Sequence, residues 1–137
     1  MQIQATLTFN GQCEEAFRFY ESCLGGKIVF LMRYSEMPEG MGTGPDWDAK
    51  VAHASFAGEG FTFSGSDSPP GYYRKPQGMA LQVNLKDVGE ADRLWAALAE
   101  GGEVTMPLEE TFWAWRFGML TDRFGTPWMI NCGKPMG

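Results

Sequence analysis

The sequence is poor in the residues that most often bind metals or cross-link chains. It contains one histidine, His53, and three cysteines among 137 residues. A single histidine excludes a metal site that is built from two histidines of one subunit. Cys13, Cys23 and Cys132 have no paired spacing, which argues against a disulfide framework or a zinc site. Their apolar neighbours indicate small buried side chains in a reducing compartment.

Long apolar runs and an excess of positive charge are missing as well. No apolar stretch is long enough to cross a membrane, and the start Met1-Gln2-Ile3-Gln4 lacks the basic and apolar parts of a signal peptide. The net charge of −6 repels a phosphate backbone. We therefore expect a cytoplasmic protein with neither a membrane nor a nucleic acid as its partner.

Apolar and aromatic residues are abundant instead. Hydrophobic residues make up 44% of the chain, including five Trp, ten Phe and four Tyr. The length fits one domain with a real core, and so many aromatic side chains are typical of a pocket or an interface.

One sequence pattern occurs twice. A segment from Glu15 to Tyr20 precedes Gly25-Gly26, and a segment from Glu90 to Trp95 precedes Gly101-Gly102. Each copy predicts a helix, a glycine stop and a strand, because the apolar residues recur at helical spacing. The predicted apolar faces are Cys13, Ala16, Phe17, Tyr20 and Leu24 in the first copy and Val88, Ala91, Leu94, Trp95 and Leu98 in the second.

Strand-like segments surround both helices. We expect strands at about 3–9, 27–34, 50–57 and 60–64, and again at 79–85, 103–106, 113–121 and 126–132. The fold class is therefore α+β, with two βαβββ modules in a single domain over 1–137. Module one covers about 1–67, a linker about 68–77, and module two about 78–133. The loops 35–49 and 65–78 are long enough to act as lids, or they carry no function.

Several segments resemble the PhnB-like branch of the vicinal oxygen chelate superfamily, which includes glyoxalases, bleomycin-resistance proteins and extradiol dioxygenases. They are Leu7-Thr8-Phe9-Asn10-Gly11, Lys50-Val51-Ala52-His53-Ala54, Thr111-Phe112-Trp113-Ala114, and the stretch from Phe117 to Asn131. The resemblance implies curved mixed sheets that enclose a cleft, a small-molecule ligand or substrate in that cleft, and a homodimer. In many members the cleft holds a divalent metal.

The family's metal positions look vacated in this chain. They fall near Ala5 and Ala80 and at Ser64 and Met129, where Gln4 is the one neighbouring side chain able to bind a metal. We therefore expect no metal and no cofactor. Whether the chain is an enzyme stays open. It binds a small organic molecule in an aromatic cleft, or it is a metal-dependent lyase, isomerase or dioxygenase, or it is a non-enzymatic interaction domain.

Two polar residues are candidates for catalysis. His53 lies on a strand between small residues and suits a general acid or base, or it is a buried structural histidine. Asp67 follows the next strand and either orients His53 or caps a turn. Some PhnB-like chains are described as ubiquinone methyltransferases, but no glycine-rich loop follows a strand here to hold a methyl donor.

The candidate ligand-binding residues are mostly aromatic. Alternation along one strand predicts that four of them share a face, as a pocket wall or as part of the core. The strand that holds His53 is the counterpart of this aromatic strand in the other module. The predicted ligand contacts are Trp113, Trp115, Phe117 and Met119 on that strand, together with Phe9, Ser64 and Trp128.

Overall fold

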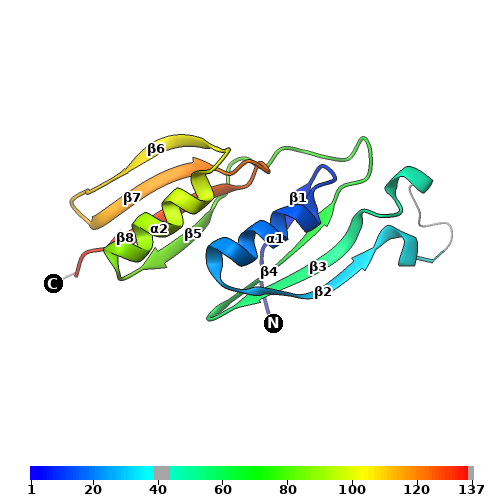
Figure 1. Cartoon of the computed structure of the whole chain (residues 1–137), viewed down its shortest axis with the longest axis horizontal. Coiled ribbons are helices and arrows are strands. Elements are labelled where there is room, and N and C mark those ends of the chain that lie inside the picture. Colours follow the sequence, from blue (N-terminus) through cyan, green and yellow to red (C-terminus); the bar gives the residue numbers. More distant parts are fainter. Residues whose placement is uncertain (39–43, 136–137) are drawn as a thin grey trace. The chain divides into compact units, whose positions relative to one another are not determined.

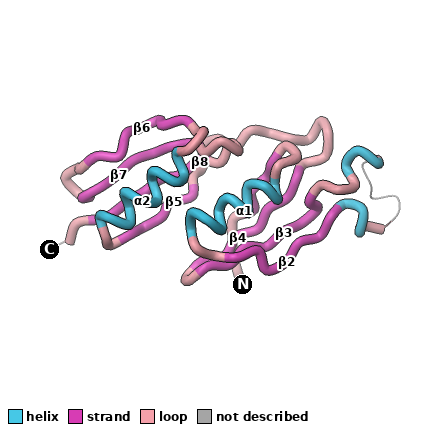
Figure 2. The backbone as a smooth tube through the Cα atoms, in the orientation of Figure 1, coloured by secondary structure: helices cyan, strands magenta, loops and turns pink. Residues whose placement is uncertain are grey.

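The computed structural model describes residues 1–38 and 44–135. The chain divides into two compact units, Met1–Lys75 and Pro76–Gly137, and each is described by itself. Figures 1 and 2 show that in each unit one helix packs on one face of a sheet. None of the described helices is long and apolar enough to span a membrane.

The first unit contains strand β1 (Thr6–Phe9), helix α1 (Cys13–Leu24), strand β2 (Lys27–Arg33), and strands β3 (Val51–Gly58) and β4 (Phe61–Asp67). Its strand order is β1-β4-β3-β2, with β1 parallel to β4 and the other pairs antiparallel. Two short 3₁₀ turns, η1 (Tyr34–Glu36) and η2 (Pro45–Trp47), lie between β2 and β3. Residues 39–43 of the predicted 35–49 loop lie outside the described residues.

The second unit repeats this plan. It contains β5 (Leu81–Leu85), α2 (Val88–Ala99), β6 (Glu103–Glu109), β7 (Ala114–Thr121) and β8 (Pro127–Gly133), in the order β5-β8-β7-β6. The predicted α+β fold with two βαβββ modules is therefore confirmed. Three boundaries differ most from the prediction. Strand β1 begins at Thr6 rather than near residue 3, β4 continues to Asp67, so residues 65–67 are strand rather than loop, and β6 extends to Glu109 rather than to 106.

Helix α1 defines two different faces of the first sheet. The ring of Phe17 contacts the rings of Phe9, Phe56 and Phe63 at centroid distances of 6.0, 5.7 and 5.5 Å. A Cβ atom at Gly65 would come within 2.5 Å of the Phe17 ring, so Gly65 faces the helix. We call this side the helix face and the opposite side the open face. Burying each of these rings stabilises the fold by roughly 2–3 kcal/mol.

The second sheet has the same two faces. A Cβ atom at Gly118 would come within 2.7 Å of the Trp95 ring of α2, which places Gly118 on the helix face. Ile130 of β8 is paired with Gly118 and therefore also lies on the helix face. The residues on either side of Gly118 and Ile130 lie on the open face, because successive residues of a strand point to opposite sides. Ile130 is fully buried, as the helix face requires.

The two helices begin in different ways. Asp87 caps α2 locally, since its carboxylate accepts a hydrogen bond from the backbone N–H of Glu90 at 2.8 Å. Gln12 precedes α1 and provides no side-chain cap. The first N–H of α1, that of Cys13, is instead bound by Asp67 at the end of β4, at 2.8 Å.

Candidate functional site

Four large side chains form an aromatic row along β7 and just before it: Trp113, Trp115, Phe117 and Met119. The pairing of β7 with β8 is irregular between Ala114 and Arg116, so strict alternation places only Phe117 and Met119 on the open face of the second sheet. Phe117 and Met119 flank Gly118 and therefore point away from α2. The rings of Trp113 and Phe117 meet edge to face at 5.2 Å. Trp113 and Trp115 are 37% and 42% exposed, so they are not part of a packed core.

Charged side chains surround Trp115 and its neighbour Arg116. The ammonium of Lys134 lies 4.9 Å from the centre of the Trp115 ring and also pairs with Glu110 at 2.7 Å. Arg116 points to the other side, as the alternation predicts, and its Nε donates to Asp92 of α2 at 3.0 Å. Because a cation already occupies one face of Trp115, Trp113 and Phe117 offer the freer aromatic surface.

Three amide side chains lie on the same open face. We call Gln82, Asn84 and Asn131 the amide row. Asn84 Oδ1 accepts from Gln82 Nε2 at 2.8 Å and from Asn131 Nδ2 at 3.2 Å. Among the described residues, the buried Oδ1 atom of Asn131 has no hydrogen-bond partner. A buried acceptor without a partner costs about 1–3 kcal/mol.

The open face of the first sheet is polar. Ser64 and Ser66 flank Gly65 and point away from α1, while Ser55 is paired with Ser64 across the strands. Thr6 and Thr8 of β1 are paired with the same two serines. These five residues form a hydroxyl row. Gln4 lies against it, since its Nε2 donates to Ser64 Oγ at 2.7 Å.

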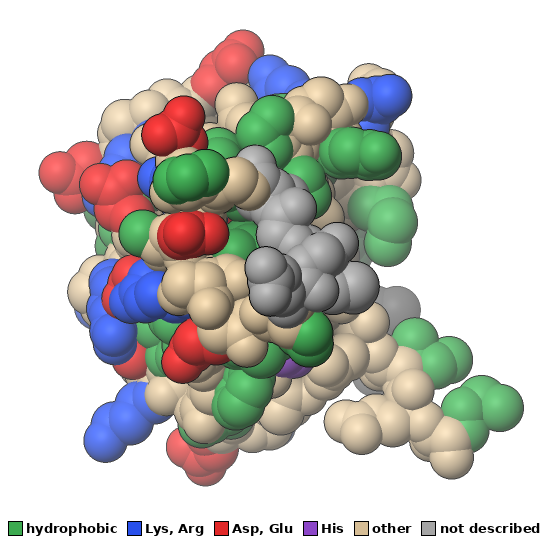
Figure 3. Space-filling view, turned by 90° about the vertical axis from the view of Figure 1, so that its right-hand side faces the viewer, with side chains coloured by type: hydrophobic (Ala, Val, Ile, Leu, Met, Phe, Trp, Pro, Cys, Tyr) green, Lys and Arg blue, Asp and Glu red, His purple; other side chains and the backbone are tan. Residues whose placement is uncertain are grey.

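His53 belongs to this polar open face. It is exposed, which excludes the alternative of a buried structural histidine. Its ring lies 3.4 Å from Ser55 Oγ, measured from Nε2, and 5.8 Å from the Phe30 ring centre. The histidine is visible at the surface in Figure 3, beside hydrophobic side chains. This position suits proton exchange with a bound molecule, so the acid–base role stays a prediction.

Asp67 lies on the helix side of its sheet and is 1% exposed. One carboxylate oxygen accepts from the N–H of Cys13 at 2.8 Å and the other from the N–H of Val51 at 2.9 Å. Its carbonyl oxygen accepts from Tyr34 Oη at 2.7 Å. Because backbone amides occupy both carboxylate oxygens, the predicted catalytic role for Asp67, in orienting His53, does not fit this position. The predicted turn cap is closer to its position.

The environment of Asp67 also affects Cys13. Burial raises the pKa of the Cys13 thiol, and the nearby charges of Asp67 and Glu14 raise it further. The reactive form of cysteine is the thiolate, so this environment disfavours a nucleophilic role for Cys13.

Two of the predicted ligand contacts lie on the helix faces, and a third is covered by a neighbouring side chain. Phe9 is fully buried on the helix face, against Phe17. Trp128 is 2% exposed, and its indole N–H donates to Asp122 Oδ2 at 2.9 Å. Ser64 is on the open face, but Gln4 binds its hydroxyl and only 1% of the residue is exposed. These positions do not suit a ligand contact by Phe9 or Trp128, and they leave little room for one at Ser64.

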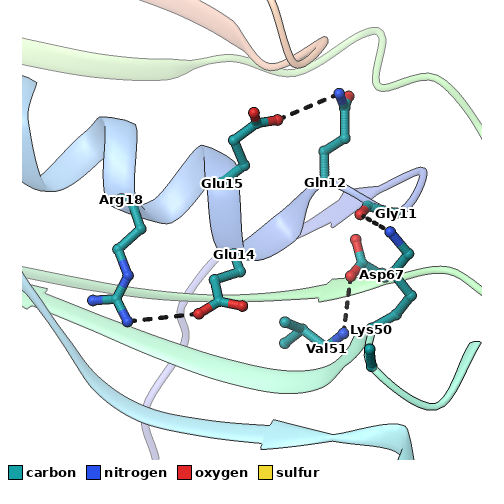
Figure 4. Close-up of a pocket in the computed structure, with 9 residues that line it drawn as sticks. Gly11, Gln12, Glu14, Glu15, Arg18, Lys50, Val51 and Asp67 are labelled. Carbon is teal, nitrogen blue, oxygen red and sulfur yellow. Dashed lines mark hydrogen bonds and ion pairs between the residues drawn. The ribbon is translucent and has the colours of Figure 1, made fainter.

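A pocket of about 470 Å³ opens at the start of α1 in module one (Figure 4). Lys50 Nζ donates to the carbonyl of Gly11 at 2.9 Å, and Glu14 pairs with Arg33 at 2.9 Å. The hydrogen bond from Arg33 lowers the pKa of Glu14. Sequence reasoning missed this pocket, because it is lined by three separate segments: Gly11, Gln12, Glu14, Glu15 and Arg18, then Ala49, Lys50 and Val51, and Asp67.

The residues at the family's metal positions do not fit a catalytic divalent ion. Such ions need oxygen or nitrogen ligands that converge on one point. Ser64 offers a hydroxyl beside the Gln4 amide, and Met129 offers a thioether beside Met119. Within residues 1–38 and 44–135, no three His, Cys, Asp or Glu side chains come together. Metal independence remains a prediction for elemental analysis to test.

The sequence pattern of the 3-demethylubiquinone-9 3-methyltransferase family matches residues 1–131 of this chain. The chain belongs to this family, in the PhnB-like branch of the vicinal oxygen chelate superfamily. Protein YjdN of Escherichia coli is 34% identical to it, with 98% of this chain and 97% of YjdN covered.

Solved structures agree with this assignment. Protein PA1353 of Pseudomonas aeruginosa is 43% identical, covers 98% of this chain and 99% of its own, and superposes with a TM-score of 0.89. The PhnB protein of Bacillus cereus is 30% identical, covers 96% and 98%, and has a TM-score of 0.80. The fosfomycin resistance protein FosX of Listeria monocytogenes is 10% identical over 98% of this chain and 94% of its own, with a TM-score of 0.68, which shows a shared fold alone.

Proposed function

We propose that the chain binds a small, planar, partly apolar organic molecule on the open face of its second sheet. The observation that carries this proposal is the aromatic row. The two tryptophans of this row are more than a third exposed, although burying an aromatic side chain is strongly favourable. A contiguous apolar patch that stays open to solvent is typical of a binding surface.

The neighbourhood of the row supports a ligand of mixed character. Met119 and Met129 are paired across β7 and β8 and extend the apolar surface, and Met106 is the partner of Met119 on β6. Methionine adapts its shape to an aromatic ligand and packs well against rings. The amide row borders the same surface and provides polar contacts, which fix the orientation of a ligand in most small-molecule sites.

Native mass spectrometry of freshly purified protein provides the first test, through co-purified small molecules. The second test is a ligand-observed NMR titration with benzofuran, a planar compound without a hydrogen-bond donor. We expect Trp113→Ala to lower benzofuran affinity about three- to ten-fold, since an aromatic pair contributes roughly 0.5–1.5 kcal/mol beyond its buried area. Val104→Ala is the matched control. Val104 is also 45% exposed, but it is the partner of buried Leu120 and so belongs to the helix face.

Equal loss of affinity in both variants, or no binding to the unchanged protein, contradicts the proposal. The methyltransferase description of the family is not extended to this chain. Its strand-to-helix connections are short, with Asn10, Gly11 and Gln12 before α1 and Lys86 and Asp87 before α2. Neither forms a glycine-rich loop of the kind that holds a nucleotide-like donor.

We further propose that the chain forms a homodimer, as its family resemblance implies. Exposed apolar side chains occur in both units, and Phe112 beside Trp113 is 90% exposed. Large apolar surfaces of this kind are often covered by a second copy of the chain. Light scattering at micromolar concentration should give twice the monomer mass of 15.2 kDa. A monomer mass would contradict this proposal and leave the ligand proposal standing.

A further inference from the structure

The pocket at the start of α1 contains two charged side chains of opposite sign that are not neutralised. Among the charged residues that line it, Glu14 and Arg18 pair with each other at 3.6 Å, and Glu14 also pairs with Arg33. Lys50 and Glu15 form no ion pair within the described residues. We propose that this pocket binds a small zwitterion, with the anionic group at Lys50 and the cationic group at Glu15. The site is separate from the ligand surface proposed for the second sheet.

The ammonium of Lys50 is held in place and keeps hydrogen-bonding capacity. One of its three N–H groups donates to the carbonyl of Gly11 at 2.9 Å, and the centre of the Trp47 ring lies 5.9 Å from its nitrogen. The other two N–H groups have no partner within the described residues. Because the half-buried ammonium is already fixed, a carboxylate of a ligand binds it with little cost of ordering the lysine side chain.

Glu15 provides the opposite charge from another wall of the pocket. It lies in the first turn of α1 and is exposed. Its one hydrogen bond within the described residues comes from the Gln12 amide at 3.5 Å, which is long for such a bond. Figure 4 shows Glu15 on the helix, whereas Lys50 reaches the Gly11 carbonyl from the segment before β3. A carboxylate bound so weakly is open to an ammonium group of a ligand.

The other charges of the pocket favour a ligand that carries both signs. Asp67 is 1% exposed, and backbone N–H groups occupy both of its carboxylate oxygens, so it adds negative charge without a free bonding atom. A simple anion at Lys50 would be repelled by Asp67 and Glu15. A simple cation at Glu15 would be repelled by Lys50 and Arg18. A zwitterion satisfies both free charges and brings no net charge into a cavity of about 470 Å³, a size typical of small-molecule sites.

The test is an NMR titration with glycine, β-alanine and γ-aminobutyrate, which differ in the spacing of their two charges. Each is compared with the alkyl carboxylate and the alkylamine of matching length. We expect the best zwitterion to bind about three- to ten-fold more tightly than either analogue, the range of one further hydrogen bond. Glu15→Gln should remove the preference over the carboxylate, and Lys50→Gln should remove the preference over the amine. Lys27→Gln and Glu100→Gln, which remove exposed charges outside the pocket, should change neither preference.

The outcomes are separable. If a carboxylate binds as tightly as its zwitterion, the role of Glu15 is overturned, and if an amine does so, the role of Lys50 is overturned. Equal losses in the two control variants would indicate unspecific charge effects and also contradict the proposal, as would no binding of any zwitterion. Glu15→Gln changes an exposed side chain and keeps the test decisive if Lys50→Gln lowers the melting temperature. Benzofuran binding should be the same in Glu15→Gln, so the two proposed sites succeed or fail independently.

Discussion

The two modules differ in chemical character more on the open faces of their sheets than on the helix faces. On the helix faces most residues stay apolar, with Phe56 matched by Leu120 and Phe63 by Trp128, and Asp67 is the exception. On the open faces they diverge, and the strand pairings match Ser55 with Met119, Ser64 with Met129, Ser66 with Asn131 and His53 with Phe117. Packing against a helix constrains one face of a duplicated module, and the other face is free to acquire its own chemistry.

The modules also differ in how their single helices are anchored. Helix α2 depends on Asp87, three residues before the N–H that it binds, and this contact is exposed. Helix α1 depends on Asp67, which is buried and also holds the first N–H of β3. Module one therefore ties its helix to its sheet through one carboxylate, whereas in module two the helix start is independent of the sheet.

The largest predicted effect tests this difference in anchoring. Asp67→Ala leaves the N–H groups of Cys13 and Val51 buried without partners, and each lost hydrogen bond to a charged group costs about 1.5–3 kcal/mol. We expect the free energy of unfolding to fall by about 3–5 kcal/mol. Asp87→Ala removes an exposed cap and should cost about 1 kcal/mol. Urea denaturation of both variants measures the difference.

Asp67→Asn serves as the intermediate control, because the amide keeps one acceptor for one of the two N–H groups. Its stability should lie between that of the unchanged protein and that of Asp67→Ala. Equal losses for Asp67→Ala and Asp87→Ala would show that the two helices are anchored to the same extent.

The next prediction compares ligand binding by the open faces of the two sheets. Phe117→Ala should lower benzofuran affinity about three- to ten-fold, because it removes the ring that packs on Trp113. His53→Ala at the equivalent position should weaken binding or turnover less. It should change the free energy of unfolding by no more than about 0.5 kcal/mol, since His53 is exposed. Titrations and melting curves of the two variants check this order. A larger binding loss for His53→Ala would place the main ligand contacts on module one.

A smaller effect is expected at the pocket beside α1. Arg33 lowers the pKa of Glu14, so the charged Glu14 stabilises the folded chain above the ordinary carboxyl pKa. This contribution is lost as the pH falls through the lowered pKa. Glu14 and Arg33 are each 36% exposed, so Glu14→Gln should cost about 0.2–1 kcal/mol near neutral pH and almost nothing in acid. Stability curves that stay parallel from neutral to acidic pH would contradict this assignment.

The smallest effect concerns metal. Among the described residues, no three His, Cys, Asp or Glu side chains come together to bind a divalent ion, so we expect a chelator to leave the melting temperature unchanged. A bound ion would stabilise the folded state by mass action, and its removal would lower the melting temperature. A clear drop after chelation, together with metal in the elemental analysis, would favour the metal-dependent alternative.

Most of the fold could be predicted from local sequence patterns. Helical spacing placed α1 and α2, and a duplicated helix-glycine-strand pattern identified the modules. The faces of the strands were harder to predict, because parity depends on turn length. The turn after β7 is longer than the turn after β3, and with this difference the strand pairings make Phe117 the counterpart of His53.

The candidate site was predicted less well, for a related reason. Phe9 and Trp128 have the composition expected of a pocket, but they point toward the helices. The amide row was missed, although the alternation of Gln82 and Asn84 along β5 was a usable signal. Its third member, Asn131, joins them only through the parallel pairing of β5 with β8, which no local pattern reveals.

The position of the α1 cap in the sequence also determines when this helix can be completed during synthesis of the chain. The carboxylate that binds the first N–H of this helix lies 54 residues further along the chain. A ribosome adding about 5–20 residues per second needs roughly 3–10 seconds to deliver it. Until then the amino end of α1 has no side-chain partner, whereas α2 carries its own cap as it emerges. The first helix of the chain is thus completed only after the whole of module one has been made.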